Sequence, residues 1–185
     1  MTQTALIIID IQNDYFPGGN MPLHEPDAAL ERAAKILDHF RARDLPRFHI
    51  RHASVRPGAS FMVPGTRGQE IHPRLAPREG EPVITKHFPS AFQETTLPEE
   101  LRNLGAENLV VCGMMTHMCI DTSVRSAFER GYRVQLIADA TATRALQFAG
   151  REVPAEQVQN AFLASLNGIF AQVLSADEWL EQAGE

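Results

Sequence analysis

The chain has 185 residues, of which 44% are hydrophobic and 22% charged, and this ordinary composition suits one globular domain with a buried core. A formal net charge of -6 and the lack of a basic run argue against a nucleic-acid partner, because phosphates require a basic patch. No window approaches the roughly 18 apolar residues of a membrane span, and two cysteines are too few for a disulfide framework. We therefore expect a single domain over residues 1–185 that does not enter a membrane.

The first apolar run, residues 5–9, is too short for the core of a signal peptide and lacks a basic leader. Together with the unpaired thiols, it predicts a cytoplasmic protein.

Apolar runs and helical patterns alternate along the chain. Buried strands are predicted at residues 5–9, 48–51, 82–85, 108–112, 133–138 and 169–174. Helices are predicted at residues 27–43, with Asp27 as N-cap, and at residues 97–104, 119–130, 154–166 and 176–182. This order predicts an α/β fold, in which helices cover both faces of a parallel sheet. The irregular stretch 52–81 is long enough to be a lid over a site.

Three chemically distinct side chains follow three of these strands. Asp10 follows the first, and its alternative role is to cap the next turn. Lys86 ends the third strand, and its alternative role is to form a structural salt bridge. Cys119 comes after the strand at residues 108–112, and Thr116 as N-cap would place it in the first turn of the next helix. Its alternative role is that of a buried apolar residue.

Carboxyl ends of parallel strands meet at one edge of a sheet, so Asp10, Lys86 and Cys119 can share one crevice. A thiol, a base and a cation are the groups that acyl transfer requires. The helix N-terminus and the lysine are both expected to lower the pKa of the Cys119 thiol, and backbone amides there could stabilise an oxyanion.

The same segments resemble the isochorismatase-like cysteine hydrolases, a superfamily that includes nicotinamidases and N-carbamoylsarcosine amidohydrolase. The matching motifs are IIIDIQNDYFPGG (residues 7–19), VITKHFPSAF (83–92) and GMMTHMCIDTSVRSAFERGYRV (113–134). Weaker matches are GTRGQEIHPRL (65–75) and ADA (138–140), so the resemblance covers nearly the whole chain.

This resemblance implies a three-layer αβα sandwich around a six-stranded parallel sheet. It implies Asp10 as general base, Cys119 as nucleophile and Lys86 as the third member of a triad. The Met114–Met115 bond matches the position of a cis peptide, which would direct the Met115 and Cys119 amides into an oxyanion hole. The implied reaction is hydrolysis of a small amide, ureido or carbamoyl compound through a thioester, by a homodimer or homotetramer.

Two departures from the family narrow this expectation. Nicotinamidases bind a divalent metal through an Asp-x-His pair after the second strand, whereas this chain has His52 and Ser54 in those places. We therefore expect no metal and no other cofactor, and nicotinamidase activity becomes unexpected. Isochorismatases proper cleave a vinyl ether without a thiol nucleophile, so Cys119 favours C–N hydrolysis.

Phe16, His52, Phe88 and His117 lie beside the triad motifs and are the candidates for the substrate pocket. His87 should point away from Lys86 by strand alternation. Two alternatives to an amidase stay open: an ether or enol hydrolase that uses Asp10 and Lys86, and a catalytically silent α/β binding module.

Overall fold

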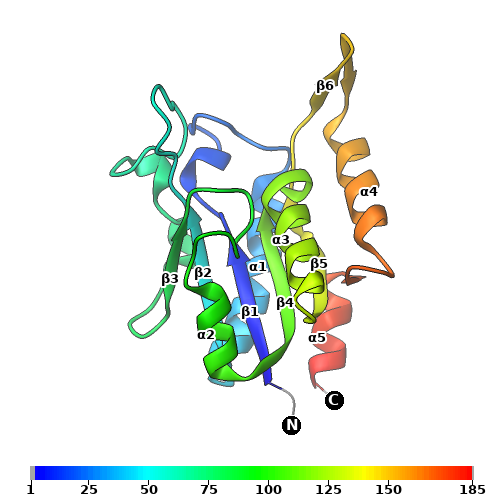
Figure 1. The fold of residues 1–185 in the computed structure, drawn as a ribbon. Coiled ribbons are helices and arrows are strands. Elements are labelled where there is room, and N and C mark those ends of the chain that lie inside the picture. The colour runs from blue at the N-terminus through cyan, green and yellow to red at the C-terminus, as the bar shows by residue number, and fades with distance from the viewer. Residues whose placement is uncertain (1–2, 185) are drawn as a thin grey trace.

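The computed structural model describes residues 3–184 and has a six-stranded sheet between two layers of helices (Figure 1). Every strand of this sheet pairs in parallel with its neighbours, in the order β3-β2-β1-β4-β5-β8. The strands are Gln3–Ile9 (β1), Arg47–His52 (β2), Val83–Lys86 (β3), Ala106–Met114 (β4), Arg133–Ala142 (β5) and Gln172–Leu174 (β8). The predicted α/β sandwich is confirmed.

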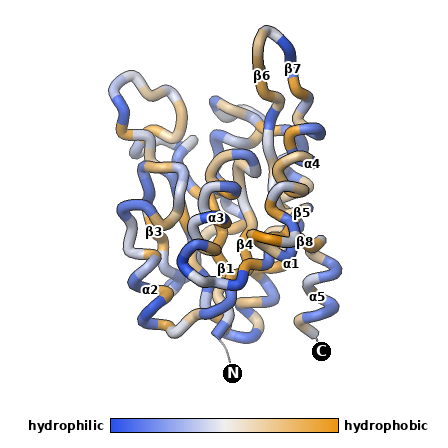
Figure 2. Tube along the Cα trace, turned by 45° about the vertical axis from the view of Figure 1, so that its right-hand side comes forward, coloured by the Kyte–Doolittle hydropathy of each residue, from blue (hydrophilic) through white to orange (hydrophobic). Residues whose placement is uncertain are grey.

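The helices form two layers because both faces of the sheet are apolar. Helices α1 (Pro26–Ala42) and α5 (Ala176–Gly184) share one core with Leu6 and Ile8 of β1. On the other face, α2 (Leu97–Leu104), α3 (Asp121–Glu129) and the end of α4 (Ala155–Leu166) share a second core with Ile7 and Ile9. Successive β1 residues thus point to opposite cores, and the central strands are mostly hydrophobic in Figure 2.

The strand order reverses between β1 and β4. From β1 the chain runs outward to β2 and β3, then returns to β4 and continues to β5 and β8. Ligands of open α/β sheets bind at such a switch point, outside the carboxyl ends of the strands. The long loop between β2 and β3 also lies at this end, which is the upper end in Figure 1.

Some element boundaries differ from those predicted. Helix α1 begins at Pro26, so Asp27 lies in its first turn and Glu25 occupies the N-cap position. A hairpin of Leu146–Phe148 (β6) and Arg151–Val153 (β7) was not predicted, because strands of three residues carry too little alternation. Within residues 3–184, no helix has the length and apolar character needed to cross a bilayer.

The loop between β2 and β3 is anchored rather than free. It contains two short 3₁₀ helices, Arg67–Gln69 and Pro73–Leu75. The Gln12 side chain accepts a hydrogen bond from the His52 amide at 2.7 Å and donates to the Gln69 carbonyl at 2.7 Å. The buried Asp14 carboxylate accepts the amides of Asn20 and Met62. Gln12 and Asp14 therefore hold the loop in place.

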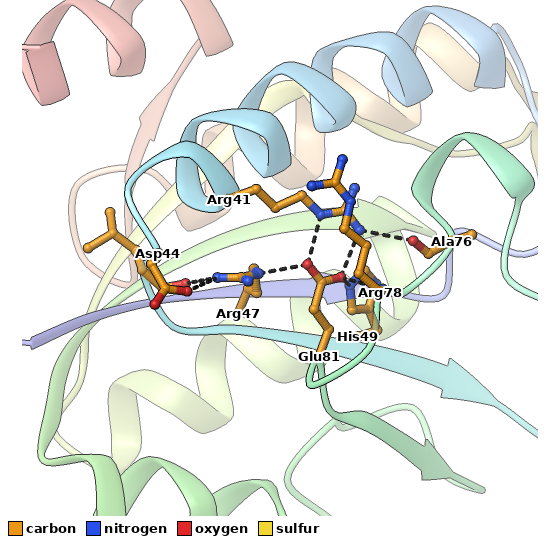
Figure 3. Close-up of polar contacts among 8 residues, drawn as sticks. Arg41, Asp44, Arg47, His49, Ala76, Arg78 and Glu81 are labelled. Atoms are coloured by element: carbon orange, nitrogen blue, oxygen red, sulfur yellow. Dashed lines mark hydrogen bonds and ion pairs between the residues drawn. The ribbon is translucent and has the colours of Figure 1, made fainter.

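A buried ion cluster around Glu81 fixes the other end of this loop (Figure 3). The Glu81 carboxylate accepts hydrogen bonds from the Arg41 guanidinium at 2.7 and 2.8 Å, from Arg47 at 2.8 Å, and from the Arg78 amide at 3.0 Å. It also contacts the buried His49 ring at 2.9 Å. Burial favours the neutral acid, but these donors hold the pKa of Glu81 well below its usual range. The loop end is thereby tied to α1 and β2.

The variant Glu81→Gln is expected to lower the free energy of unfolding by about 3 kcal/mol at pH 7, because two guanidiniums lose their buried counter-charge. In a chain of this size that corresponds to about 6–12 °C in Tm, measurable by thermal denaturation. The ionised Glu81 carboxylate stabilises the fold, and its pKa is depressed in the folded state. The difference in Tm between wild type and variant should therefore narrow as the pH falls below about 4.5.

The matched control is Glu129→Gln, a surface carboxylate without an ion pair within residues 3–184. Its Tm should stay within about 2 °C of wild type. Equal melting temperatures for the two variants would show that the Glu81 cluster adds no stability.

Candidate active site

Asp10 is fully buried at the end of β1, beside the switch point. Its φ of +52° is left-handed, a conformation that aspartate tolerates better than most residues. The Asp10 amide donates to the Ile50 carbonyl of β2 at 2.9 Å, which holds this turn in place. The chain thus leaves the strand abruptly, and the carboxylate stays in the crevice between β1 and its neighbours.

Gly113 in β4 permits close approach of the two central strands. Its φ is +130°, and a Cβ there would lie 1.9 Å from the Ile9 carbonyl oxygen, so no other residue fits. The cis Met114–Met115 peptide follows, at the position that the resemblance implied. The π-helical turn Thr116–Ile120 then leads into α3, and Cys119 lies within this turn.

Thr116 does not cap this helical segment, contrary to the expectation from the sequence. The N-cap position belongs to Met115, and Thr116 is the first residue inside the turn. Its hydroxyl is buried and has no hydrogen-bond partner among the described residues. Cys119 nevertheless lies in the first turn of a continuous helical segment, as predicted.

Lys86 joins the other two side chains. Its fully buried ammonium lies 2.6 Å from Asp10 Oδ2 and donates to Cys119 Sγ at 3.3 Å. It also donates to the Phe88 carbonyl at 3.1 Å and contacts His52 Nδ1 at 3.3 Å. The structure therefore brings Asp10, Lys86 and Cys119 together at one edge of the sheet, as the positions of the three strand ends predicted.

The electrostatics of the trio keep the lysine charged and the thiol neutral. Burial lowers the pKa of Lys86, but Asp10 and Cys119 outweigh it and raise that pKa overall. Burial, followed by the Asp10 charge, raises the pKa of the Cys119 thiol to about 12, although Lys86 pulls it down. The expectation of a low thiol pKa is therefore corrected: removal from water outweighs the lysine beside it.

The Asp10 carboxylate has unused capacity to accept hydrogen bonds. It forms the ion pair with Lys86, yet neither oxygen accepts a well-aligned hydrogen bond from residues 3–184. Burial and the Lys86 charge lower the pKa of His52, so its ring is neutral and can accept the lysine N–H. Lys86 is thus surrounded by one carboxylate and several neutral acceptors.

A cavity of about 500 Å³ opens above Cys119. The loop after β2 forms one wall with residues 54–59 and Phe61, and the segment after β5 contributes Arg144. The remaining lining residues come from the other strand ends and turns: Tyr15, Met21, His52, His87, Pro89, Met115, Met118 and Cys119. The predicted lid therefore contributes directly to the pocket.

Of the four predicted pocket residues, only His52 lines this cavity. Phe16 is buried in the core and packs against His72, with ring centroids 4.4 Å apart. Phe88 contributes its backbone carbonyl to Lys86, and His117 turns away to contact Thr143 and Phe162. Proximity in sequence to a triad motif did not determine which way these side chains point.

His87 lines the cavity, although strand alternation predicted that it points away from Lys86. Strand β3 ends at Lys86, so the two-residue period no longer applies to the next residue. The His87 ring contacts the Ala53 carbonyl at 2.8 Å. Sequence reasoning also missed Tyr15, Arg56 and Arg144, which come from turns and loops without a periodic pattern.

His52 and Ser54 occupy the places where the resemblance puts metal ligands in nicotinamidases. Both line the cavity, but the His52 Nδ1 atom contacts the Lys86 ammonium. Within residues 3–184, no three His, Cys, Asp or Glu side chains converge as a metal-binding group. The residues at these positions therefore do not fit the family's metal site.

Comparisons with known proteins agree with this fold. The family model of the Isochorismatase domain matches residues 4–178. The chain belongs to the isochorismatase family. It is an isochorismatase-family hydrolase with an α/β sandwich whose strand ends carry the three side chains described above.

Relatives of this isochorismatase-family chain match over almost its full length. The uncharacterized isochorismatase family protein YddQ of Bacillus subtilis is 50% identical, with 96% of this chain and 99% of that protein covered. A crystal structure assigned to the isochorismatase hydrolases, from Oleispira antarctica, is 44% identical with a TM-score of 0.94 and covers 97% of each chain. An isochorismatase from Pseudomonas putida is 38% identical with a TM-score of 0.90, covering 95% of this chain and 89% of that one.

Proposed function

We propose that this protein hydrolyses a C–N amide-type bond of a small molecule, with Cys119 as nucleophile, Asp10 as general base and Lys86 as the charged partner of both. The observation that carries the proposal is that one buried ammonium contacts both the Asp10 carboxylate and the Cys119 sulfur. Cys119 itself lines a cavity large enough for a small substrate.

Named relatives support this reaction class. Nicotinamidase 3 of Arabidopsis thaliana is 31% identical over 151 residues, which cover 75% of this chain and 73% of that protein. Streptothricin hydrolase of Streptomyces noursei is 32% identical over 139 residues, 75% of this chain and 54% of that protein. A nicotinamidase acts on an amide, which favours C–N cleavage here as well.

The first half of the reaction converts a neutral thiol into a thioester. Asp10 takes the Cys119 proton as the sulfur attacks the carbonyl carbon, because a thiol with a pKa of about 12 is protonated in the free enzyme. The backbone amides of Met115 and Cys119 stabilise the oxyanion that forms. The C–N bond then breaks, and ammonia or an amine leaves with the proton that Asp10 had taken.

The second half restores the enzyme. Asp10 takes a proton from water as the water oxygen attacks the thioester carbon. The C–S bond then breaks, the carboxylic acid product leaves, and Asp10 returns the proton to the sulfur. Lys86 remains cationic throughout, so it stabilises the ionised Asp10 and the thiolate as each appears. The proposed reaction proceeds without a metal, and nicotinamidase activity itself is not expected.

The experiment is a panel of small primary amides, ureas and carbamoyl compounds, incubated with the purified protein while ammonia release is measured. We expect at least one compound to be hydrolysed with a turnover number in the usual enzymatic range of about 1–10³ per second. Isochorismate belongs in the same panel, because the similar protein from Pseudomonas putida is named an isochorismatase. Turnover of isochorismate alone, without ammonia release from any amide, would favour the ether or enol hydrolase.

Other expectations from the sequence remain predictions. A homodimer or homotetramer is one of them, and light scattering with size-exclusion chromatography tests it. A cytoplasmic location and a small-molecule partner are the others.

A further inference from the structure

The cavity wall carries positive charge without a compensating acid. Arg56 enters it from the loop after β2, and Arg144 enters it from the segment after β5. Among residues 3–184, none of those that line the cavity is an aspartate or a glutamate. The two histidines of the wall are His52 and His87. A ligand in this cavity therefore meets two guanidinium groups from two separate parts of the chain.

Both guanidiniums are available to a ligand. The guanidinium groups of Arg56 and Arg144 form no hydrogen bond or ion pair with residues 3–184. By contrast, Arg41 and Arg125 elsewhere in the fold hold carboxylates at 2.7 and 2.9 Å. An unpaired arginine on an open surface is ordinary. Two unpaired arginines in the wall of a cavity are different, because each guanidinium presents a planar fork of N–H donors that suits a carboxylate.

The rest of the wall is largely apolar. Met21, Phe61, Met115 and Met118 line the same cavity as the two arginines. Such a surface suits a short carbon chain or ring between two polar ends. The cavity thus combines the proposed nucleophile at Cys119, apolar side chains, and cationic groups from the loops.

We propose that the substrate is an anionic amide, whose carboxylate or comparable anionic group is held by Arg56 and Arg144 while its amide carbonyl lies at Cys119. This rests on the proposed function, because it assigns the substrate class of the same site. The loop after β2 supplies Arg56, so this loop selects the substrate by charge. A neutral amide of the same size lacks the ion pairs and leaves both guanidiniums unpaired.

The test is a binding measurement on the Cys119→Ala protein, which cannot turn its ligands over by the proposed route. Isothermal titration calorimetry compares matched pairs that differ only in charge: malonamate with malonamide, succinamate with succinamide, and glutaramate with glutaramide. In at least one pair the carboxylate should bind about tenfold or more tightly than the diamide. Raising the salt concentration should reduce this preference, because screening weakens ion pairs.

Arginine variants assign the effect to the cavity. Arg56→Gln and Arg144→Gln, made in the Cys119→Ala protein, should each reduce the preference for the carboxylate over the diamide about tenfold. Arg102→Gln in α2 is the matched control, because it changes the net charge equally outside the cavity and should keep the preference. Thermal denaturation verifies that all variants fold.

Equal binding within every pair, no binding of any carboxylate, or an Arg102→Gln effect equal to the other two would overturn the proposal. These outcomes are separable from failure of the proposed function. Ammonia release from neutral amides that depends on Cys119 would support the reaction while the anion preference fails. Tight, arginine-dependent carboxylate binding without any amide hydrolysis would support the anion preference while the proposed reaction fails.

Discussion

Cys119→Ala is expected to reduce kcat/KM for the best amide of the panel by at least about 10⁴-fold, because no other group in the site can form the thioester. Cys119 is 6% exposed, and the variant should fold with only a modest loss of stability. Ammonia release at saturating and limiting substrate measures the effect. Mass spectrometry of the wild type during turnover should reveal an acyl adduct that the variant lacks.

Cys112→Ala is the matched control for this prediction. The same atoms are removed from the other buried cysteine, which lies within β4 with no exposed surface. Burial raises the pKa of its thiol to about 12, and it contacts the core rather than the cavity. Its activity should remain within about threefold of wild type, since core packing and not chemistry changes. If Cys119→Ala retained activity, hydrolysis would proceed through Asp10 and Lys86 without a thiol.

Asp10→Asn is expected to lower kcat by about 10²–10⁴-fold, because the variant loses the base that takes the thiol proton. The same variant should react faster with iodoacetamide at Cys119. The Asp10 charge raises the pKa of this thiol, whereas Lys86 lowers it, so the neutral amide leaves the lysine unopposed. Each unit by which the pKa falls gives about tenfold more thiolate at a pH below it.

Alkylation is followed between pH 7 and pH 10 by intact mass, with peptide mapping to separate Cys119 from Cys112. Wild-type Cys119 should react more slowly than a free cysteine peptide at pH 7, since its thiol is protonated there. Asp38→Asn, a surface change on α1, should alter neither hydrolysis nor alkylation. If Asp10→Asn slowed both reactions, Asp10 would be a structural support for the site rather than its base.

Much of the site was predictable because parallel sheets impose a simple rule. Residues that follow different strands meet at one edge, and Asp10, Lys86 and Cys119 obey it. The rule works because each side chain is within a residue or two of a regular strand or helix. The six strands were recognisable because both faces of the sheet are buried, which requires continuous apolar runs such as Ile7–Ile9.

The pocket was less predictable because its wall comes from loops. Tyr15, Arg56 and Arg144 lie in segments without a periodic pattern. Tyr15 lines the cavity and Phe16 does not, although the two residues are adjacent at the end of a tight turn. Backbone turns of this kind reverse the direction of neighbouring side chains, so adjacency in sequence carries little information. The β6–β7 hairpin escaped prediction for a related reason, because strands of three residues are shorter than the periodic signal.

The sequence by itself determined the family, the α/β sandwich and the three strand-end groups, because hydrophobic periodicity and local motifs are properties of short segments. Only the tertiary structure decided the charge state of the site and the wall of the pocket. The Cys119 thiol is neutral because many residues from distant segments exclude water from it, and that exclusion outweighs the lysine 3.3 Å away. Burial of this kind depends on the whole fold and cannot be read from a motif.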